Sequence, residues 1–289
     1  MKRFDSDSSG NHSFAASCAW QASLKLAFAN DEGVTRMVGR SHVGPLRVQK
    51  PLYPEGGDVC HAVVVHPPGG VVGGDELGIA ASLKDGARAF ITTPGAAKWY
   101  RANGRVSRQD VRLELGARAA LEWLPQETIF FNGAHVRLDH SVALAGDAAY
   151  IGWEILCFGR TASGEAFNSG RIEQRTSIRR DGRLLWFEQG ALDGGSASMH
   201  SPLALGCHTV CATLIAVGAP IAAATLKALR EEAEGGPGQF GMTQMKSVLV
   251  ARHLGNSSEA AKNHMMRVWQ RIRPELMGRS GFMPRIWNT

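Results

Sequence analysis

Most of the first 215 residues consist of short runs in which apolar and polar side chains alternate, separated by turns that contain glycine. In the run at residues 21–28, alanine, leucine and phenylalanine occupy every second position, and the turn at residues 30–33 follows. Similar runs flank Asp85-Gly86 and Asp181-Gly182. A period of two places alternate side chains on opposite faces of a strand, and Asp-Gly is a strong turn signal. Turn signals about every eight to twelve residues, without intervening helices, predict an antiparallel or solenoid-like β fold.

Glycine is frequent in this chain, which agrees with a fold rich in turns. The sequence has 34 glycines and 12 prolines among 289 residues, and the absence of a three-residue glycine period excludes a collagen-like helix. Hydrophobic residues make up 44% and charged residues 20%, which is too apolar for intrinsic disorder. A chain of this length can bury its own core as one large domain or two small ones.

Helical signals occur only near the C-terminal end. A first helix is predicted near residues 220–233, with Pro220 in its first turn. A second is predicted near residues 257–273 and is ended by Pro274. Polar side chains such as His264 are expected to face away from its apolar stripe. That stripe comprises Ala261, Met265, Val268, Trp269 and Ile272.

No low-complexity linker divides the chain, so we expect one β-rich domain over residues 17–289 after a flexible tail at residues 1–16. The first 12 residues lack the apolar segment of a signal peptide. Residues 194–226 carry no acidic residue, lysine or arginine, but their prolines and glycines favour a buried strand followed by a helix over a membrane span. Five scattered cysteines without a C-x-x-C pair indicate reduced thiols. These features predict a cytoplasmic protein.

The C-terminal part of the chain is basic. The formal net charge is +6, and residues 245–289 contain eight bases and two acids, so the rest of the chain is nearly neutral. Such a surface could bind nucleic acid or an acidic protein, or could be an ordinary solvated helix face. The sequence offers no groove-reading motif, which disfavours the nucleic-acid interpretation.

The motifs of several enzyme classes are absent from the sequence. It contains no G-x-x-x-x-G-K-[ST] phosphate loop, no G-x-S-x-G nucleophile motif and no H-E-x-x-H zinc motif. The glycine-rich segment 69–74 lacks the order of a dinucleotide-binding loop, so we interpret its glycines as allowing tight turns and close backbone approach. On a strand, Cys207 and Cys211 would face one side and His208 the other, so these residues are not expected to converge on a metal ion.

Several acidic residues occur in apolar surroundings. Glu154 lies inside an apolar run at residues 150–158, Glu188 follows a second such run, and Asp75 and Glu76 end the glycine-rich segment. A buried carboxylate is costly unless it is paired, hydrated or bound to a cation. A hydrolase with Asp75 or Glu154 as general base would lack a paired nucleophile or histidine, which disfavours this interpretation. The acids are either satisfied polar groups of the core or part of a hydrated interior suited to hard or borderline cations.

Six ordered motifs give the chain a family resemblance. The most distinctive is H-P-P-G-G-V-V-G-G-D-E-L at residues 66–77, and the others lie at residues 42–46, 93–101, 121–127, 157–167 and 284–287. In these motifs the chain resembles the urease accessory protein UreD family, also called UreH. The resemblance implies a mainly β fold, a β-helix-like stack of short strands with two α-helices near the C-terminus.

The resemblance also implies a non-enzymatic role in urease maturation. Members of the family form a complex with the accessory protein UreF and the GTPase UreG, and this complex docks on apo-urease. The resemblance implies that the UreD-type subunit conducts nickel through an internal polar tunnel. The expectation is therefore a scaffold and metallochaperone with nickel in transit, without a tightly bound cofactor and without a nucleic-acid or membrane partner.

The resemblance assigns roles to individual positions. A transient nickel path is implied for Asp75, Glu76, Glu154 and Glu188. A tunnel or structural role in the shared motifs is implied for Lys98, Tyr100, Gly70, Gly73 and Gly74. We place the surface that faces UreF on the second helix and residues 284–287, because exposed aromatic and arginine side chains fit the composition of an interface core. The candidates there are Trp269, Arg285 and Trp287.

Overall fold

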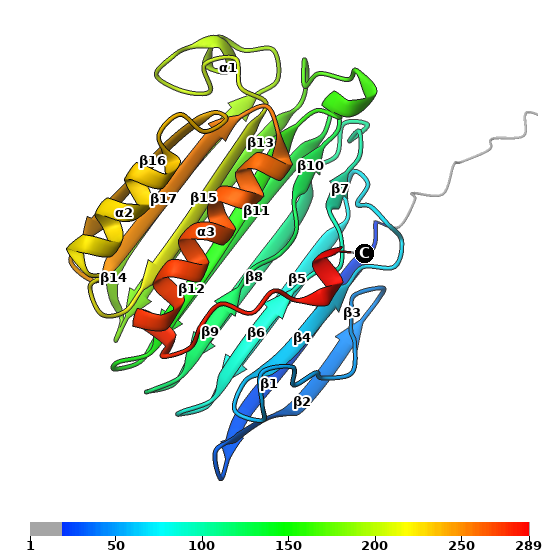
Figure 1. Ribbon diagram of the computed structural model, residues 1–289. Helices are drawn as coiled ribbons and strands as arrows, with labels where there is room; N and C mark the ends of the chain where they lie inside the picture. The colour runs from blue at the N-terminus through cyan, green and yellow to red at the C-terminus, as the bar shows by residue number, and fades with distance from the viewer. Residues whose placement is uncertain (1–18, 289) are drawn as a thin grey trace, which may run out of the picture.

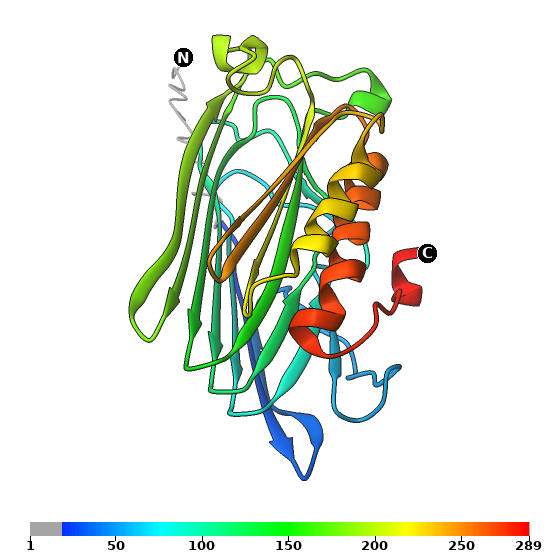
Figure 2. The same ribbon diagram turned by 60° about the vertical axis from the view of Figure 1, so that its left-hand side comes forward.

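The computed structural model describes residues 19–288, so the tail expected at residues 1–16 lies outside the described residues. Two β-sheets lie face to face, and helices cover one outer side (Figures 1 and 2). The seven-stranded sheet consists, in spatial order, of β14 (Arg183–Asp193), β13 (Arg171–Arg180), β11 (His135–Leu144), β8 (Ser107–Leu115), β5 (Glu76–Leu83), β1 (Gln21–Asp31) and β2 (Val34–Val43).

The opposite sheet has ten strands. Its main path consists of β16 (Gln239–Met245), β17 (Val248–Gly255), β15 (Val210–Val217), β12 (Ala149–Phe158), β9 (Ala120–Trp123), β6 (Arg88–Thr92), β4 (Cys60–Val65) and β3 (Arg47–Val48). Beside this path, β10 (Thr128–Phe130) pairs with both β12 and β7 (Ala97–Trp99). The prediction of a mainly β fold is thus confirmed.

From β4 to β13 the chain passes repeatedly between the two sheets, so its successive turns stack as parallel strands; β6 and β7, and likewise β9 and β10, follow each other within the ten-stranded sheet. The strands β1, β5, β8, β11 and β13 are parallel neighbours in register. Their inward side chains form apolar rows across the sheet, one of which consists of Leu26, Ala81, Leu113, Val142 and Ile178. This stacking decides between the two β folds that the sequence left open, in favour of the solenoid-like one. Antiparallel pairs are found at the sheet ends, in β1–β2, β13–β14 and the group β12, β15, β17 and β16.

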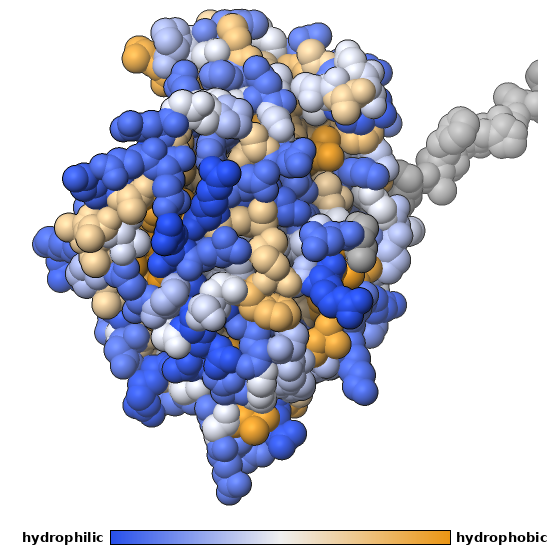
Figure 3. Space-filling model, viewed as in Figure 1, coloured by the Kyte–Doolittle hydropathy of each residue, from blue (hydrophilic) through white to orange (hydrophobic). Residues whose placement is uncertain are grey.

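The core has two layers because strands such as β12 are apolar on both faces. Tyr150 and Leu156 point between the sheets, whereas Trp153 and Ile155 point to the outer side. There they pack under α2 (Ala223–Ala233) and α3 (Ser258–Met277), which lie across this sheet (Figure 2). The outer surface of this side is largely hydrophilic, with scattered apolar side chains (Figure 3).

Short helical segments complete the described chain: α1 (Ala197–His200) and the 3-10 turns η1 (Thr161–Ser163) and η2 (Arg285–Asn288). The segment 194–226 contains a buried strand, β15, followed by the start of α2, as the sequence predicted. Across residues 19–288, none of the helices has both the length and the apolarity needed to cross a membrane.

Both predicted C-terminal helices are present, with two corrections. Ser257 caps α3, its hydroxyl accepting a hydrogen bond from the Ala260 N–H at 3.2 Å. The helix does not end at Pro274 but continues to Met277, because Met277 packs into the second core layer and Gly278, at φ +68°, provides a left-handed cap. The expectation that His264 faces away is also wrong, because this side chain is buried against the sheet, next to His253.

Candidate functional site

A polar layer replaces the apolar core where the β13–β14 end of one sheet faces β12, β15 and β17 of the other. On each of these strands, every second side chain points between the sheets, and the polar side chains of this layer occupy the same alternate positions as the apolar rows. The polar layer consists of His140, Tyr150, Glu154, Gln174, Thr176, Glu188, Cys211, Thr213 and Arg252.

Glu154 lies at the centre of the polar layer. The Gln174 side-chain amide donates a hydrogen bond to its carboxylate. The side chain borders a cavity of about 30 Å³, which Thr213 also lines and which is large enough for a water molecule. Burial raises the pKa of Glu154 to about 7, the negative charge of Glu188 adds to this rise, and the Gln174 hydrogen bond and the Arg252 charge oppose it. The carboxyl group is therefore in a polar pocket but only partly ionised near neutral pH.

An ion pair joins the two sheets beside Glu154. Glu188 is on β14 and Arg252 is on β17, and the Arg252 Nη2 lies 2.7 Å from the Glu188 Oε1. The two side chains are 34% and 46% exposed, respectively, so the pair lies where the polar layer meets solvent. Burial, together with the negative charge of Glu154, raises the pKa of the neighbouring Cys211 thiol to about 11.

A histidine and a tyrosine also line this cavity. The His140 Nε2 lies 2.9 Å from the Tyr150 hydroxyl oxygen. Burial lowers the pKa of His140 to about 4 and raises that of Tyr150, so both side chains are neutral at pH 7. The pair supplies hydrogen-bonding groups without net charge next to Glu154.

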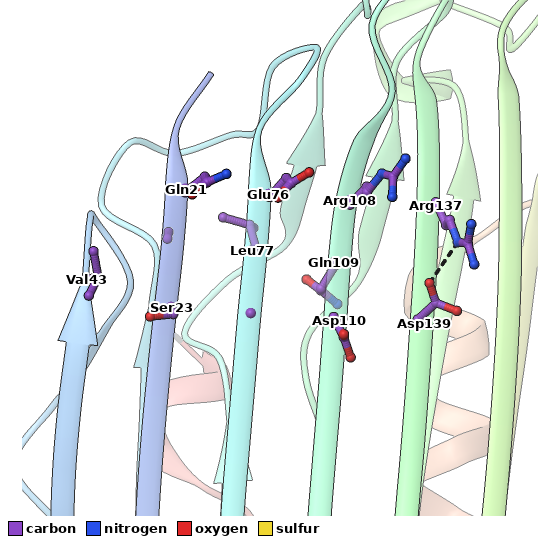
Figure 4. A pocket seen from close by; sticks show the side chains of 12 residues that line it. Gln21, Ser23, Val43, Glu76, Leu77, Arg108, Gln109, Asp110, Arg137 and Asp139 are labelled. Carbon is purple, nitrogen blue, oxygen red and sulfur yellow. Dashed lines mark hydrogen bonds and ion pairs between the residues drawn. The ribbon is translucent and has the colours of Figure 1, made fainter. Parts of the chain in front are cut away.

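The structure separates Asp75 and Glu76 from these carboxylates. Asp75 is buried and accepts hydrogen bonds from the Trp20 and Val72 backbone N–H groups, at 3.0 and 3.1 Å, so it holds the glycine-rich loop in shape. Glu76 faces the outside of the seven-stranded sheet, in an open hollow of about 510 Å³ (Figure 4). The strand β5, which begins at Glu76, lies three inter-strand spacings, roughly 14 Å, from β13.

The hollow that holds Glu76 is a charged surface. Arg108 lies beside Glu76 on the neighbouring strand β8, and Arg137 follows in the same row on β11 (Figure 4). Arg137 donates a hydrogen bond to the Asp139 carboxylate at 2.8 Å, and Arg175 pairs with the other oxygen of Asp139. Arg137 and Arg175 are therefore both paired with a carboxylate of the same surface.

The two glycine-containing motifs pack against each other. Backbone hydrogen bonds of 2.8 Å join Val71 to Lys98 and to Tyr100. A Cβ atom at Gly70 would lie 2.2 Å from the Tyr100 ring, and one at Gly73 would lie 1.9 Å from the Ala102 carbonyl oxygen. The interpretation of these glycines as sites of close backbone approach is confirmed.

Other residues of the same motifs complete this end of the molecule. Gly74 has φ +96°, a left-handed conformation that favours glycine. The Lys98 side chain is exposed, and it borders a largely apolar cavity of about 190 Å³. The buried Nε2 of His66 and Nε1 of Trp99, both lining residues of this cavity, have no hydrogen-bond partner. The shared motifs thus approach each other closely at Gly70 and Gly73 and enclose this cavity beside them.

The two tryptophans assigned to a partner surface are buried within this chain. Trp269 is fully buried, and its Nε1–H donates to Glu122. The Trp287 Nε1–H donates to the Thr92 hydroxyl at 2.8 Å. The expectation that these rings are exposed is wrong, because both fill the core between α3 and the sheet. Arg285 is exposed.

A buried charge network was not predicted from the sequence. Arg273 on α3 is fully buried and forms paired hydrogen bonds with both Glu55 and Glu122, at 2.6–2.9 Å. Glu55 also contacts His61, with 2.7 Å between Oε1 and Nε2. The only sequence signal was that Arg273 lies four residues after Trp269, on the apolar face of the helix.

Cys207 and Cys211 lie in different surroundings. Cys207 lies outside β15, in a left-handed conformation with φ +67°, and its Sγ is 3.5 Å from the His200 Nδ1. Cys211 is on β15 and points into the polar layer. Throughout residues 19–288, no three or more His, Cys, Asp or Glu side chains are grouped in a way that could hold a metal ion.

The fold and the polar layer define a class of protein: a solenoid-like β protein with carboxylates between its sheets instead of a preformed metal cage. A family model described as UreD urease accessory protein matches residues 21–288. This chain belongs to the UreD family of urease accessory proteins.

Individual relatives match over nearly the whole chain. The urease accessory protein UreD of Janthinobacterium sp. (strain Marseille) is 68% identical over 273 residues, which cover 93% of this chain and 92% of the relative. The UreD protein of Nitrosospira multiformis is 56% identical over 272 residues, covering 93% and 98% of the two chains. That of Methylobacillus flagellatus is 45% identical over 270 residues, covering 93% and 95%.

Proposed function

We propose that this chain is a urease maturation factor. It acts as a non-catalytic scaffold and metallochaperone that docks a UreF–UreG complex onto apo-urease in the cytoplasm and helps to deliver nickel to the urease active site. The observation that carries the proposal is the family match over residues 21–288, with relatives that are named urease accessory proteins. Nickel is cargo in this proposal, and the chain needs no tightly bound cofactor.

The polar layer supports a nickel path between the sheets. Glu154 and Glu188 come from opposite sheets and point into the same layer. Separate carboxylates replace part of the hydration of a divalent ion and release it again, whereas a closed cage of four ligands would retain it. The participation of Asp75 and Glu76 in the same path stays a prediction, because one shapes a loop and the other faces outward.

The nucleic-acid alternative loses support from the way the basic residues are used. Of the C-terminal bases, Arg252, Arg271, Arg273 and Arg279 all form ion pairs with carboxylates of the same chain. Nucleic-acid binding needs cations that are available to neutralise phosphates. Half of the eight basic residues in this region are therefore engaged in ion pairs within the chain.

Reconstitution tests the proposal directly. Apo-urease is incubated with UreF, UreG, GTP, bicarbonate and nickel, with and without this chain, and urease activity and nickel content are measured. We expect activation to require the chain. Equal activation without it, with the assembly of cognate partners confirmed, would show that the proposal is wrong.

The variant Glu154→Gln tests the nickel path. It keeps the shape and hydrogen-bonding capacity of the side chain but removes its charge, so we expect normal complex assembly and activation lowered by roughly tenfold. Assembly is checked by size-exclusion chromatography. The matched control is Glu231→Gln, which removes an exposed carboxylate of α2. Full activation by Glu154→Gln would exclude this carboxylate from the path.

A further inference from the structure

Arg252 occupies the boundary between the polar layer and solvent. β14 is the edge strand of its sheet, and β17 is next to the edge of the other, on the same side of the molecule. The 2.7 Å contact of Arg252 with Glu188 therefore bridges the gap between the sheets. Glu154, with its small cavity, lies behind this bridge.

The guanidinium is the counter-charge of more than one group. Its positive charge acts on Glu154 and Cys211 as well as on Glu188, its direct partner. Glu154 and Glu188, two carboxylates from opposite sheets, supply oxygen atoms that a divalent cation in transit, such as Ni²⁺, can contact. In the structure, Arg252 supplies the positive charge that such a cation would bring.

Because the Glu188–Arg252 ion pair is partly exposed, separating its two partners costs little free energy. Ion pairs that reach solvent contribute little to stability, whereas fully buried pairs are costly to break. Glu188 and Arg252 are partly exposed, but Arg273 and its two glutamates are enclosed. Of these two arginine–glutamate arrangements, the Arg252 bridge is the one that can open without disturbing the core.

We propose that Arg252 is an exchangeable counter-cation of the polar layer. A divalent cation that enters the layer replaces Arg252 as the partner of Glu188, and the guanidinium returns when the cation leaves. No covalent bond changes, and one ionic partner replaces another. Arg252 is thus a positioning residue that weakens retention of the cation so that it can be released. This inference rests on the proposed function, in which nickel passes through this layer.

The test measures binding of Ni²⁺ alone to the full chain by equilibrium dialysis, and its release by stopped-flow competition with a chelator. Arg252→Met keeps an unbranched side chain without the charge. We expect it to bind Ni²⁺ about tenfold more tightly and to release it correspondingly more slowly, because the competing charge is gone. Arg252→Lys retains a cation and should stay within about twofold of the natural chain.

Two controls make the result specific. Arg171→Met breaks comparable ion pairs, with Glu173 and Asp193, at an arginine that is also 46% exposed but lies outside the polar layer. It should leave Ni²⁺ affinity unchanged. In a Glu188→Gln background, Arg252→Met should no longer tighten binding, because the contested carboxylate is absent. Thermal unfolding confirms that each variant is folded.

The outcomes separate this inference from the proposed function. Unchanged affinity in Arg252→Met, an equal gain in Arg171→Met, or a gain that persists in Glu188→Gln would each overturn the exchange. If urease activation did not require the chain, the proposed function would fail, but the dialysis and release measurements would still decide whether Arg252 competes with the cation.

Discussion

Arg273 shows how a single side chain can fix the position of a helix. Its guanidinium satisfies both Glu55 and Glu122, and it lies 5.3 Å from the centre of the Trp269 ring. A charge without solvent contact is tolerated only when its partners compensate it fully. Arg273 therefore fixes α3 to the outer face of the ten-stranded sheet.

Replacing this arginine should be severely destabilising. In Arg273→Met, two carboxylates lose their main counter-charge, and we expect the free energy of unfolding to fall by about 3–5 kcal/mol. Urea denaturation followed by tryptophan fluorescence measures the change. Arg271→Met, which breaks an exposed pair with Glu232, should cost less than about 1 kcal/mol. Similar losses in the two variants would contradict the role assigned to Arg273.

Individual residues also show the limits of reading the sequence. The interior position of Glu154 was predictable because strongly apolar neighbours surround it. The Arg273 network was not, because its partners lie 218 and 151 positions away in the chain. Trp269 and Trp287 were placed on a surface by their residue type, but the packing of α3 buries both. Pairings across the fold leave no local pattern in a sequence.

At the level of elements, the loop at residues 66–75 and the segment at residues 93–101 form one unit. Gly73→Ala would place a methyl group against the Ala102 backbone carbonyl, which cannot move as a flexible side chain can. We expect a loss of about 3 kcal/mol in the free energy of unfolding. Gly95→Ala is the matched control, because nothing lies within 4 Å of its added atom, and it should change stability by less than about 0.5 kcal/mol. Equal stability of the two variants in urea would refute the packing argument.

Helix boundaries were predictable where local chemistry decides them. Ser257 acts as the N-cap of α3, at the start predicted for this helix. Pro274 did not end the helix, because proline forbids one hydrogen bond but tertiary packing of Met277 favours another turn. Local capping chemistry thus determines where α3 begins, and tertiary packing determines where it ends.

At the level of the whole molecule, strand alternation predicted the β class but not the way in which the strands pair. Both an antiparallel meander and a solenoid produce the same period of two, because the period describes only which face a side chain occupies. The parallel pairing of Gln21 with Glu76 joins residues 55 positions apart, which no short-range signal encodes. The polar layer arises from this pairing, so its full membership could not be predicted either.

Acid stability is also a property of the whole fold. Burial lowers the pKa of His140 and of His253 to about 4, so the unfolded chain takes up protons first, and stability should fall as the pH drops from about 6.5 to 4. Between pH 7 and 4.5, the raised pKa of Glu154 acts in the opposite sense and offsets part of this loss. Burial alone would raise the pKa of Glu55, but hydrogen bonds with His61 and Arg273 lower it to about 2. The stabilisation of the fold by ionised Glu55 is therefore present above pH 4.5 and is lost as the pH falls below 4.5.

Urea titrations at several pH values measure this profile. We expect a further loss on the order of 3 kcal/mol between pH 4.5 and 2 from Glu55 alone. In Glu55→Gln, the starting stability should be lower, but the decline below pH 4.5 should be shallower. A profile below pH 4.5 that is parallel to that of the natural chain would show that Glu55 does not carry the acid dependence.

The order of the elements along the chain has a consequence for biosynthesis. Every strand of the ten-stranded sheet precedes α3, the helix that covers its outer face. During translation, the sheet can therefore be complete while Trp153, Ile155 and their apolar neighbours still face water. Such nascent chains are prone to aggregation, and the time between synthesis of β17 and docking of Arg273 is the interval of greatest risk. A cell that makes this protein must therefore keep the nascent chain from aggregating until α3 has docked on the sheet.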